Sequence, residues 1–279
     1  MKNFAIVIGA QKSATTTLYY WLRDNPNINI NRNIKELDFF SNDEKFEKGK
    51  NYYLTEYFDN AQNNLCYVDV SPQYSYELKS IERIAQFGEN IKIIYIVRDP
   101  IERMMSAFSM LKRRGIETRT FEQAMEDEIK KFNQEGFSKD FSEKNYLYVS
   151  LYGHILDAYA DYFSLNKIHV IKTSDIAIQA KKEYEMLCAF LKLDFESIPE
   201  SVGEVFHKGG NIRYPFISNL YDYLKKAIPF RPKFARGIGY WIEQWNIQPK
   251  STSENFNSSL LKELEAIFEI DKSKLNEYL

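Results

Sequence analysis

The sequence has little cysteine, no excess of basic charge and no long apolar run. Its two cysteines, Cys66 and Cys188, lie far apart and offer neither a metal-ligand spacing nor a disulfide framework. The formal net charge of −2 gives no overall electrostatic reason to bind nucleic acid. Because neither a secretory signal nor a run of about 20 apolar residues is found, we expect a cytoplasmic location and no membrane partner.

The length and composition indicate one globular domain. A chain of 279 residues can bury a substantial core, and 44% apolar with 27% charged residues is ordinary for a folded protein. No internal repeat or low-complexity segment interrupts the chain. We therefore predict a single domain that spans residues 1–279.

The start of the chain combines a strand, a loop of small residues and a helix. Residues 4–8 are apolar and rich in β-branched side chains, which is typical of a strand buried on both faces of a parallel sheet, and Gly9 permits a tight turn after it. Apolar residues at helical spacing predict a helix that begins at Thr15 or Thr16. The loop between them presents free backbone N–H groups at a helix N-terminus, which suits an anion.

This loop differs from the nucleotide-binding P-loop, G-x-x-x-x-G-K-[ST], at two essential positions. When the pattern is laid over residues 9–16, its second glycine becomes Ala14 and its lysine becomes Thr15. The lysine of the loop is Lys12, which lies where it could reach a leaving group close to the first phosphorus. A kinase that uses ATP and magnesium, with Asp99 as metal ligand, is one alternative, but it lacks its partner lysine.

The loop resembles the 5′-phosphosulfate loop, QK[SA]GT[ST], of the sulfotransferases that use 3′-phosphoadenosine 5′-phosphosulfate (PAPS). Ala14 replaces the glycine of that pattern; its methyl group crowds a close backbone approach but removes no donor. The resemblance implies a P-loop NTPase-like three-layer α/β fold with a central parallel sheet of about five strands. It makes Lys12 a catalytic residue. The implied donor-binding residues here are Gln11, Lys12, Ser13, Ala14, Thr15, Thr16 and Thr17.

A second segment, residues 35–40 (KELDFF), resembles the KE-x-H-F-F segment of heparan-sulfate-type and many bacterial sulfotransferases. The resemblance makes Glu36 the catalytic base, because an acceptor hydroxyl must lose its proton as it attacks sulfur. We expect burial near Phe39 and Phe40 to raise the pKa of Glu36. Asp38 stands where the family often has histidine and is a weaker candidate for the same role.

Another polar group follows a second predicted core strand, which ends at Val70. Ligands bind at the carboxyl ends of parallel strands, so we expect Asp69, Ser71 and Tyr74 to face the same cleft as Lys12. The family often has E-K-[ST]-P-x-Y here, with its lysine assisting catalysis, and Val70 occupies the position of that lysine. Lys12 would then carry the leaving-group role alone, and a non-catalytic nucleotide-binding relative is a further alternative.

The clearest strand of the sequence, residues 91–97, runs directly into a helix. Pro100 suits the first turn of this helix, with Asp99 as its N-cap. Arg98 at the strand end and Ser106 two turns down the helix can reach one phosphate with a bidentate fork and a hydroxyl. The RDP…S spacing resembles the 3′-phosphate-binding segment of the PAPS family.

Two weaker patterns complete the candidate site. Lys208, Gly209 and Gly210 match a K-G-[RG] loop that in the PAPS family contacts the 3′-phosphate and adenine side, and Arg213 follows them. A basic cluster near residue 115 is interpreted as a solvated face, although an anionic acceptor would also suit it. This cluster consists of Lys112, Arg113, Arg114 and Arg119.

Together, the resemblances imply transfer of a sulfuryl group from PAPS, with adenosine 3′,5′-bisphosphate (PAP) as product. The expected acceptor is a hydroxyl, with an amine as second choice, of a small molecule such as a secondary metabolite. A carbohydrate acceptor is the alternative. The sequence offers no cluster of metal ligands, so we predict no metal site.

Overall fold

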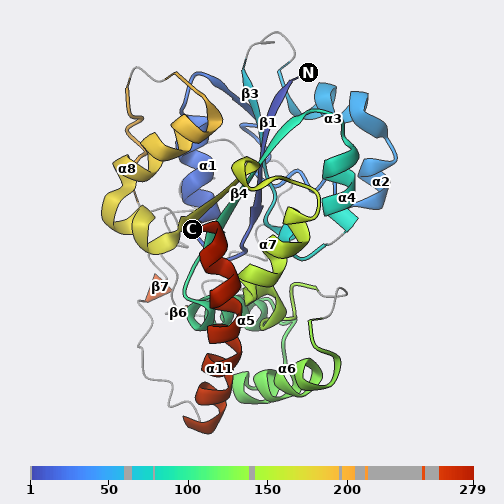
Figure 1. The fold of residues 1–279 in the computed structure, drawn as a ribbon, viewed down its shortest axis with the longest axis vertical. Helices are drawn as coiled ribbons and strands as arrows, with labels where there is room; N and C mark the ends of the chain where they lie inside the picture. The colour runs from blue at the N-terminus through green and yellow to red at the C-terminus, as the bar shows by residue number, and fades with distance from the viewer. Residues whose placement is uncertain are drawn as a thin grey trace. The chain divides into compact units, whose positions relative to one another are not determined.

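The computed structural model in Figure 1 describes most of the chain. The described residues are 2–59, 65–77, 79–137, 142–194, 197–204, 211–212, 247–248 and 258–279. By its contacts the chain forms two compact units, Met1–Glu204 with Phe256–Leu279, and Val205–Asn255. In the second unit, β6 (Asn211–Ile212) pairs antiparallel with β7 (Ile247–Gln248). The single-domain interpretation stays a prediction.

The first unit is built on a parallel sheet with the strand order β2-β3-β1-β4-β5. Its strands are β1 (Asn3–Gly9), β2 (Ile28–Ile30), β3 (Cys66–Val70), β4 (Asn90–Val97) and β5 (Ile168–Lys172). All four strand pairs are parallel, which confirms the predicted α/β fold with a central sheet of five strands.

Both faces of the sheet are buried, as the apolar run at the start of the chain predicts. Phe4, Ile6 and Ile8 of β1 pack into one hydrophobic cluster, and Ala5 and Val7 pack into another. Successive side chains of a strand point to opposite faces, so a strand without polar alternation must be covered on both sides. The sheet is therefore the middle layer of three.

Helices supply the outer layers, as Figure 1 shows. One face is covered by α1 (Thr15–Arg23) and α8 (Thr173–Leu191). The cluster on the other face includes side chains from α3 (Gly49–Tyr57), α4 (Lys79–Gln86), α5 (Pro100–Arg113), α6 (Phe121–Glu135), α7 (Tyr152–Ala160) and α11 (Ser258–Leu275). Short α2 (Asp43–Phe46) precedes α3, and the 3-10 helix η1 (Pro72–Ser75) follows β3.

The last helix is joined to α7 by charged groups as well as apolar contacts. The Asp271 carboxylate accepts the backbone N–H groups of Gly153 and His154, each at 3.0 Å, at the N-terminus of α7. Lys274 forms an ion pair of 2.6 Å with Asp157. A carboxylate is favourable at the positive end of the helix dipole, so Asp271 stabilises α7 from a distant part of the chain.

Two local features position the loops at the carboxyl edge of the sheet. Asp99 is the N-cap of α5, as predicted, and its Oδ1 accepts the backbone N–H of Glu102 at 2.8 Å. Gly9 has a φ of 146°, and a Cβ placed there would lie 2.8 Å from Ser75 Oγ. Only glycine fits this conformation and this close approach, so β1 ends directly against η1.

No helix in the described part of the chain has both the length and the apolar content of a membrane span.

Candidate functional site

In the loop between β1 and α1, the first backbone N–H group forms a hydrogen bond with another described residue and the last ones do not. Ala10 donates its N–H to the Ile96 carbonyl at 2.8 Å, which ties the loop to β4, and Ser13 donates to the Ala10 carbonyl at 3.1 Å. The backbone N–H groups of residues 14–17 donate to no other described residue. Unpaired amides at the N-terminus of a helix can bind an anion, and the anion-binding role of this loop stays a prediction.

Two residues of the loop adopt the left-handed backbone conformation. Lys12 has a φ of 74°, and Ala14, the N-cap of α1, has a φ of 62° with a ψ of 20°. A side chain in this conformation costs about 1–2 kcal/mol relative to the right-handed one, and glycine avoids most of that cost. The physical reason for glycine at the position of Ala14 in the resembled pattern is therefore the backbone angle itself.

Lys12 lies among positive charges. Burial, and then repulsion from Arg113, Arg114, Arg98 and Lys35 in that order, lowers its pKa to about 8. No carboxylate of the described residues forms an ion pair with Lys12. Arg98 and Lys35 are paired with Glu102 and Glu36, but the charges that act most strongly on Lys12 are all positive, so the surroundings of Lys12 are electropositive.

Arg98 reaches the same loop from the end of β4. Its Nη1 donates to the Lys12 carbonyl at 3.4 Å, and its Nη2 forms an ion pair of 2.7 Å with Glu102. The structure thus brings Lys12 and Arg98 together, although 86 residues separate them in the sequence. One ligand that carries two anionic groups could contact both.

The helix that follows Arg98 presents one stripe of residues toward this loop. Glu102, Ser106 and Arg113 lie on one side of α5, because steps of four and seven residues return to the same helix face. Glu102 holds Arg98, and the charge of Arg113 acts on Lys12. Ser106 lies between them on the stripe and is partly buried.

Glu36 lies beside the start of α1. Lys35 Nζ lies 3.0 Å from Glu36 Oε1 and donates to Thr15 Oγ1 at 3.3 Å, so it connects the carboxylate to the loop. The expected burial of Glu36 is wrong, because its side chain is 46% exposed while Phe39 and Phe40 turn into the core.

Burial acts instead on its neighbour. Asp38 is half-buried, and burial raises its pKa. One of its carboxylate oxygens, Oδ1, has no hydrogen-bond partner among the described residues, and the other lies 3.9 Å from Lys45 Nζ. Asp38 therefore stays a second candidate for the base, because a raised pKa favours proton transfer near neutral pH.

The polar residues after β3 do not face the cleft as expected. Asp69, Ser71 and Tyr74 are fully buried, and both Ser71 and Tyr74 donate hydroxyl hydrogen bonds to the Asp69 carboxylate, at 2.6 and 2.9 Å. Val70 is also buried, in the cluster under α1 and α8. These four side chains therefore support the site from below and do not reach its surface.

Several residues of the site were not predicted. Arg113 and Arg114 are exposed, as the interpretation of a solvated face expects, but their charges also act on Lys12, whereas Lys112 donates to the carbonyls of Thr118 and Arg119. Glu143 accepts a hydrogen bond of 3.4 Å from Gln11 Nε2, which adds a carboxylate to the loop. No local pattern identifies these contacts, because each one joins segments that are distant in the sequence. Each contact also depends on the direction in which a side chain points.

Behind the loop lies a buried layer of polar groups. The hydroxyl of Tyr152 lies beside Ser13 and the backbone of Arg98, and burial raises its pKa to about 12. Arg103 is fully buried; its Nε donates to Ser150 Oγ and its Nη2 to the Tyr146 carbonyl, both at 2.7 Å. The charge of Arg103 acts on the Tyr152 hydroxyl and on the buried Glu128 carboxylate, so these groups form one buried polar layer.

The predicted K-G-[RG] loop is not among the described residues. Lys208, Gly209, Gly210 and Arg213 lie outside the described residues. No group of three or more potential metal ligands gathers in the described part of the chain, and the prediction of no metal site stays a prediction.

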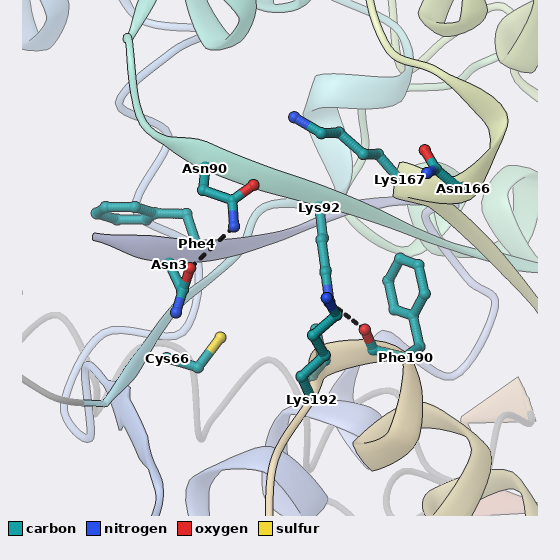
Figure 2. Close-up of a pocket in the computed structure, with 10 residues that line it drawn as sticks. Asn3, Phe4, Cys66, Asn90, Lys92, Asn166, Lys167, Phe190 and Lys192 are labelled. Carbon is teal, nitrogen blue, oxygen red and sulfur yellow. Dashed lines mark hydrogen bonds between the residues drawn. The ribbon is translucent and has the colours of Figure 1, made fainter. Parts of the chain in front are cut away.

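A cavity of about 350 Å³ lies at the opposite edge of the sheet, near the amino ends of β1, β3 and β4 (Figure 2). Asn3, Cys66 and Lys92 line it, and the Lys92 ammonium donates to the Phe190 carbonyl. Burial, and then repulsion from Lys192, lowers the pKa of Lys92. Seven residues of β1 separate this edge from the loop by roughly 20 Å, so the cavity is no part of the candidate site.

Comparison with known proteins identifies the family of the chain. The family model of the sulfotransferase domain matches residues 3–208, so the chain belongs to the sulfotransferase family. The chain is 25% identical over 194 residues to mouse heparan sulfate glucosamine 3-O-sulfotransferase 5, a match that covers 68% of this chain and 53% of that protein. The human protein of the same name is 26% identical over the same shares. The chain thus spans about half the length of these relatives.

Two solved structures share the fold. A sulfotransferase from Alicyclobacillus acidocaldarius is 23% identical with a TM-score of 0.59, over 85% of this chain and 99% of that one. Mouse sulfotransferase SULT7A1 complexed with PAP is 13% identical with a TM-score of 0.52, over 100% of this chain and 89% of that one. At these identities the likeness shows the fold alone.

The left-handed conformation of Ala14 leads to a stability prediction. Ala14→Gly should raise the free energy of unfolding by about 1 kcal/mol, because glycine adopts this conformation without the Cβ clash. Urea denaturation measures the change. As a matched control, Ala158→Gly inside α7 should lower the free energy of unfolding by about 0.5–1 kcal/mol. Equal losses in both variants would contradict the backbone argument.

Proposed function

We propose that this chain transfers a sulfuryl group from PAPS to a hydroxyl of an acceptor molecule. The observation that carries the proposal is the meeting of Lys12 and Arg98 at one electropositive loop with unpaired amides. PAPS has anionic groups at the 3′ and 5′ positions of its ribose, so two separated cationic contacts suit it. Membership of the sulfotransferase family and a structural neighbour complexed with PAP support the same donor.

The donor would lie across the carboxyl edge of the sheet. Amides of residues 14–17, with the hydroxyls of Ser13, Thr15, Thr16 and Thr17, would hold the 5′-phosphate at the start of α1. Arg98 and Ser106 would hold the 3′-phosphate, and Lys208, which lies outside the described residues, is proposed from the sequence as a further contact to it. Glu102, which pairs with Arg98, would then share that arginine with the phosphate.

The reaction is an in-line displacement at sulfur. A bond forms between the acceptor oxygen and sulfur while the bond between sulfur and the bridging oxygen of the donor breaks. Glu36 would take the acceptor proton, and Lys12 would neutralise the charge that develops on the departing bridging oxygen. The exposed Glu36 carboxylate, connected to the loop by Lys35, can meet an acceptor that enters from solvent.

The acceptor proposed from the sequence is a small molecule, such as a secondary metabolite. A carbohydrate acceptor is the second candidate, and two observations favour it. The mouse and human relatives described above are heparan sulfate glucosamine sulfotransferases, and Arg113 and Arg114 are exposed residues whose charges reach Lys12. An anionic sugar chain would be attracted to this side of the site.

The kinase alternative loses support from the structure. Asp99, which would hold magnesium in that case, accepts the N–H of Glu102 as the cap of α5. The cytoplasmic location and the absence of a membrane partner stay predictions, and one relative is named a membrane-associated sulfotransferase, from Dictyostelium discoideum.

Transfer from labelled PAPS to a panel of alcohols, phenols, amines and sugars tests the proposed activity. Lys12→Ala should lower turnover by about 100-fold or more, because charge on the leaving oxygen is no longer neutralised. Lys92→Ala is the matched control, since Lys92 is also a partly buried lysine but lies at the other edge of the sheet. Wild-type turnover in Lys12→Ala would remove the role assigned to Lys12.

The role of Arg98 predicts a defect in nucleotide binding. Arg98→Ala should weaken PAP binding about 10- to 100-fold, because the variant loses a charge-assisted contact to phosphate. Calorimetry measures the change in affinity. Arg23→Ala is the control, because Arg23 is 31% exposed and paired with Asp24, whereas Arg98 is 32% exposed and paired with Glu102. Unchanged PAP affinity in Arg98→Ala would rule out the phosphate contact.

The pKa of Lys12 predicts how PAP binding depends on pH. Burial and neighbouring cations lower this pKa to about 8, and a bound anion would raise it, so the complex holds more protons than the free protein above that pH. The association constant should therefore fall by up to about tenfold per pH unit above pH 8. In Lys12→Arg this dependence should disappear, because guanidinium stays charged. Constant wild-type affinity up to about pH 10 would contradict the assignment.

A further inference from the structure

A buried carboxylate lies at the centre of a network of hydroxyl groups below the site. Asp69 Oδ1 accepts a hydrogen bond of 2.6 Å from Ser71, and its Oδ2 accepts hydrogen bonds of 2.9 Å from both Tyr53 and Tyr74. All four residues are fully buried. A carboxylate without a basic partner is costly to bury, so the three hydroxyls that stabilise it define an arrangement with little freedom.

Two of these hydroxyls also accept hydrogen bonds from the segment that carries Glu36. Ser71 Oγ accepts the backbone N–H groups of Leu37 at 3.0 Å and Asp38 at 3.2 Å, and the Tyr74 hydroxyl accepts that of Phe40 at 3.3 Å. A hydroxyl that donates to a carboxylate has its lone pairs free to accept, so Asp69 orients both groups. Three amides in four residues are thereby tied to one carboxylate.

The same network abuts the donor loop. Ser71 donates its backbone N–H to the Val7 carbonyl at 3.1 Å, next to the end of β1. A Cβ on Gly9 would lie 2.8 Å from Ser75 Oγ and 3.1 Å from the Pro72 carbonyl, which shows how closely η1 approaches the first residue of the loop. The segment of Glu36 and the loop of Lys12 are therefore placed against one common element, η1.

We propose that Asp69, acting through Ser71 and Tyr74, is a positioning residue that sets the Glu36 carboxylate at its working distance from the donor loop. This inference rests on the proposed function, in which Glu36 is the base. An in-line transfer requires the acceptor, the base and the sulfur in one alignment, and a displacement of about 1 Å can cost about 100-fold in rate. Glu36 itself is exposed, so its position depends on the backbone that carries it.

The test compares variants that remove one hydroxyl from the network. Ser71→Ala removes the acceptor for two amides, and Tyr74→Phe removes the acceptor for one, so each should lower kcat by about tenfold or more. The affinity for PAP should change by less than about twofold, because the donor loop keeps its own contacts. If Ser71→Ala fails to fold, Tyr74→Phe decides the result. A weaker PAP affinity with unchanged kcat in either variant would overturn the proposal.

Tyr184→Phe is the matched control for the loss of a buried hydroxyl. Tyr184 is fully buried on the other face of the sheet, and its hydroxyl accepts a hydrogen bond of 2.6 Å from Asn25. It should lower stability about as much as Tyr74→Phe does, with kcat within about twofold of wild type. An equal loss of kcat in both tyrosine variants would show a general effect of lost stability and overturn the proposal.

A double variant separates this inference from the proposed function. If the network acts through Glu36, adding Ser71→Ala to Glu36→Gln should lower kcat by less than about twofold beyond Glu36→Gln alone. An undiminished tenfold loss in that background would overturn the positioning role and leave Glu36 as the base. Wild-type kcat in Glu36→Gln would remove the base from the proposed function, and the inference with it.

Discussion

The structure depends on the loop between β1 and α1, where several energetically unfavourable features occur together and no interaction within the loop offsets them. Lys12 and Ala14 both adopt the left-handed conformation, the amides of residues 14–17 have no partner among the described residues, and the charges that act most strongly on Lys12 are positive. The loop keeps this unfavourable conformation only because packing against the surrounding sheet and helices fixes its backbone. An anion would relieve repulsion and satisfy amides at once, which is why the loop is best explained as a binding site.

The rest of the fold holds two other segments against this loop. The end of β4 supplies Arg98, which contacts the Lys12 carbonyl, and the segment after β2 supplies Glu36, which Lys35 connects to Thr15. Because all strands of the main sheet are parallel, their carboxyl ends lie at one edge. The parallel topology therefore brings three separate segments of the sequence together at one site.

Val70 stands where the resembled pattern has a lysine, and this difference changes which residues form the site. The resembled pattern has a catalytic lysine there, whereas Val70 lies in the core under α1 and α8. Its neighbours Asp69 and Ser71 are buried instead of facing the cleft, and Ser71 connects Asp69 to the backbone of residues 37–38. The segment after β3 thus contributes support, and the positive charge of the site comes from Lys12, Arg98 and the arginines at the end of α5.

Local sequence was enough to predict the first strand, the start of α1 and the cap of α5, because each depends on neighbouring residues: an apolar run, a helix start and Asp99 before Pro100. The five-stranded parallel sheet was predicted from the family resemblance. Burial and the distances between remote residues depend on how the whole chain packs. No local pattern could show that Glu36 is exposed, that Asp69 is enclosed by hydroxyls, or that Arg113 reaches Lys12. These features arise from side-chain direction and from packing between distant segments, which local periodicity does not encode.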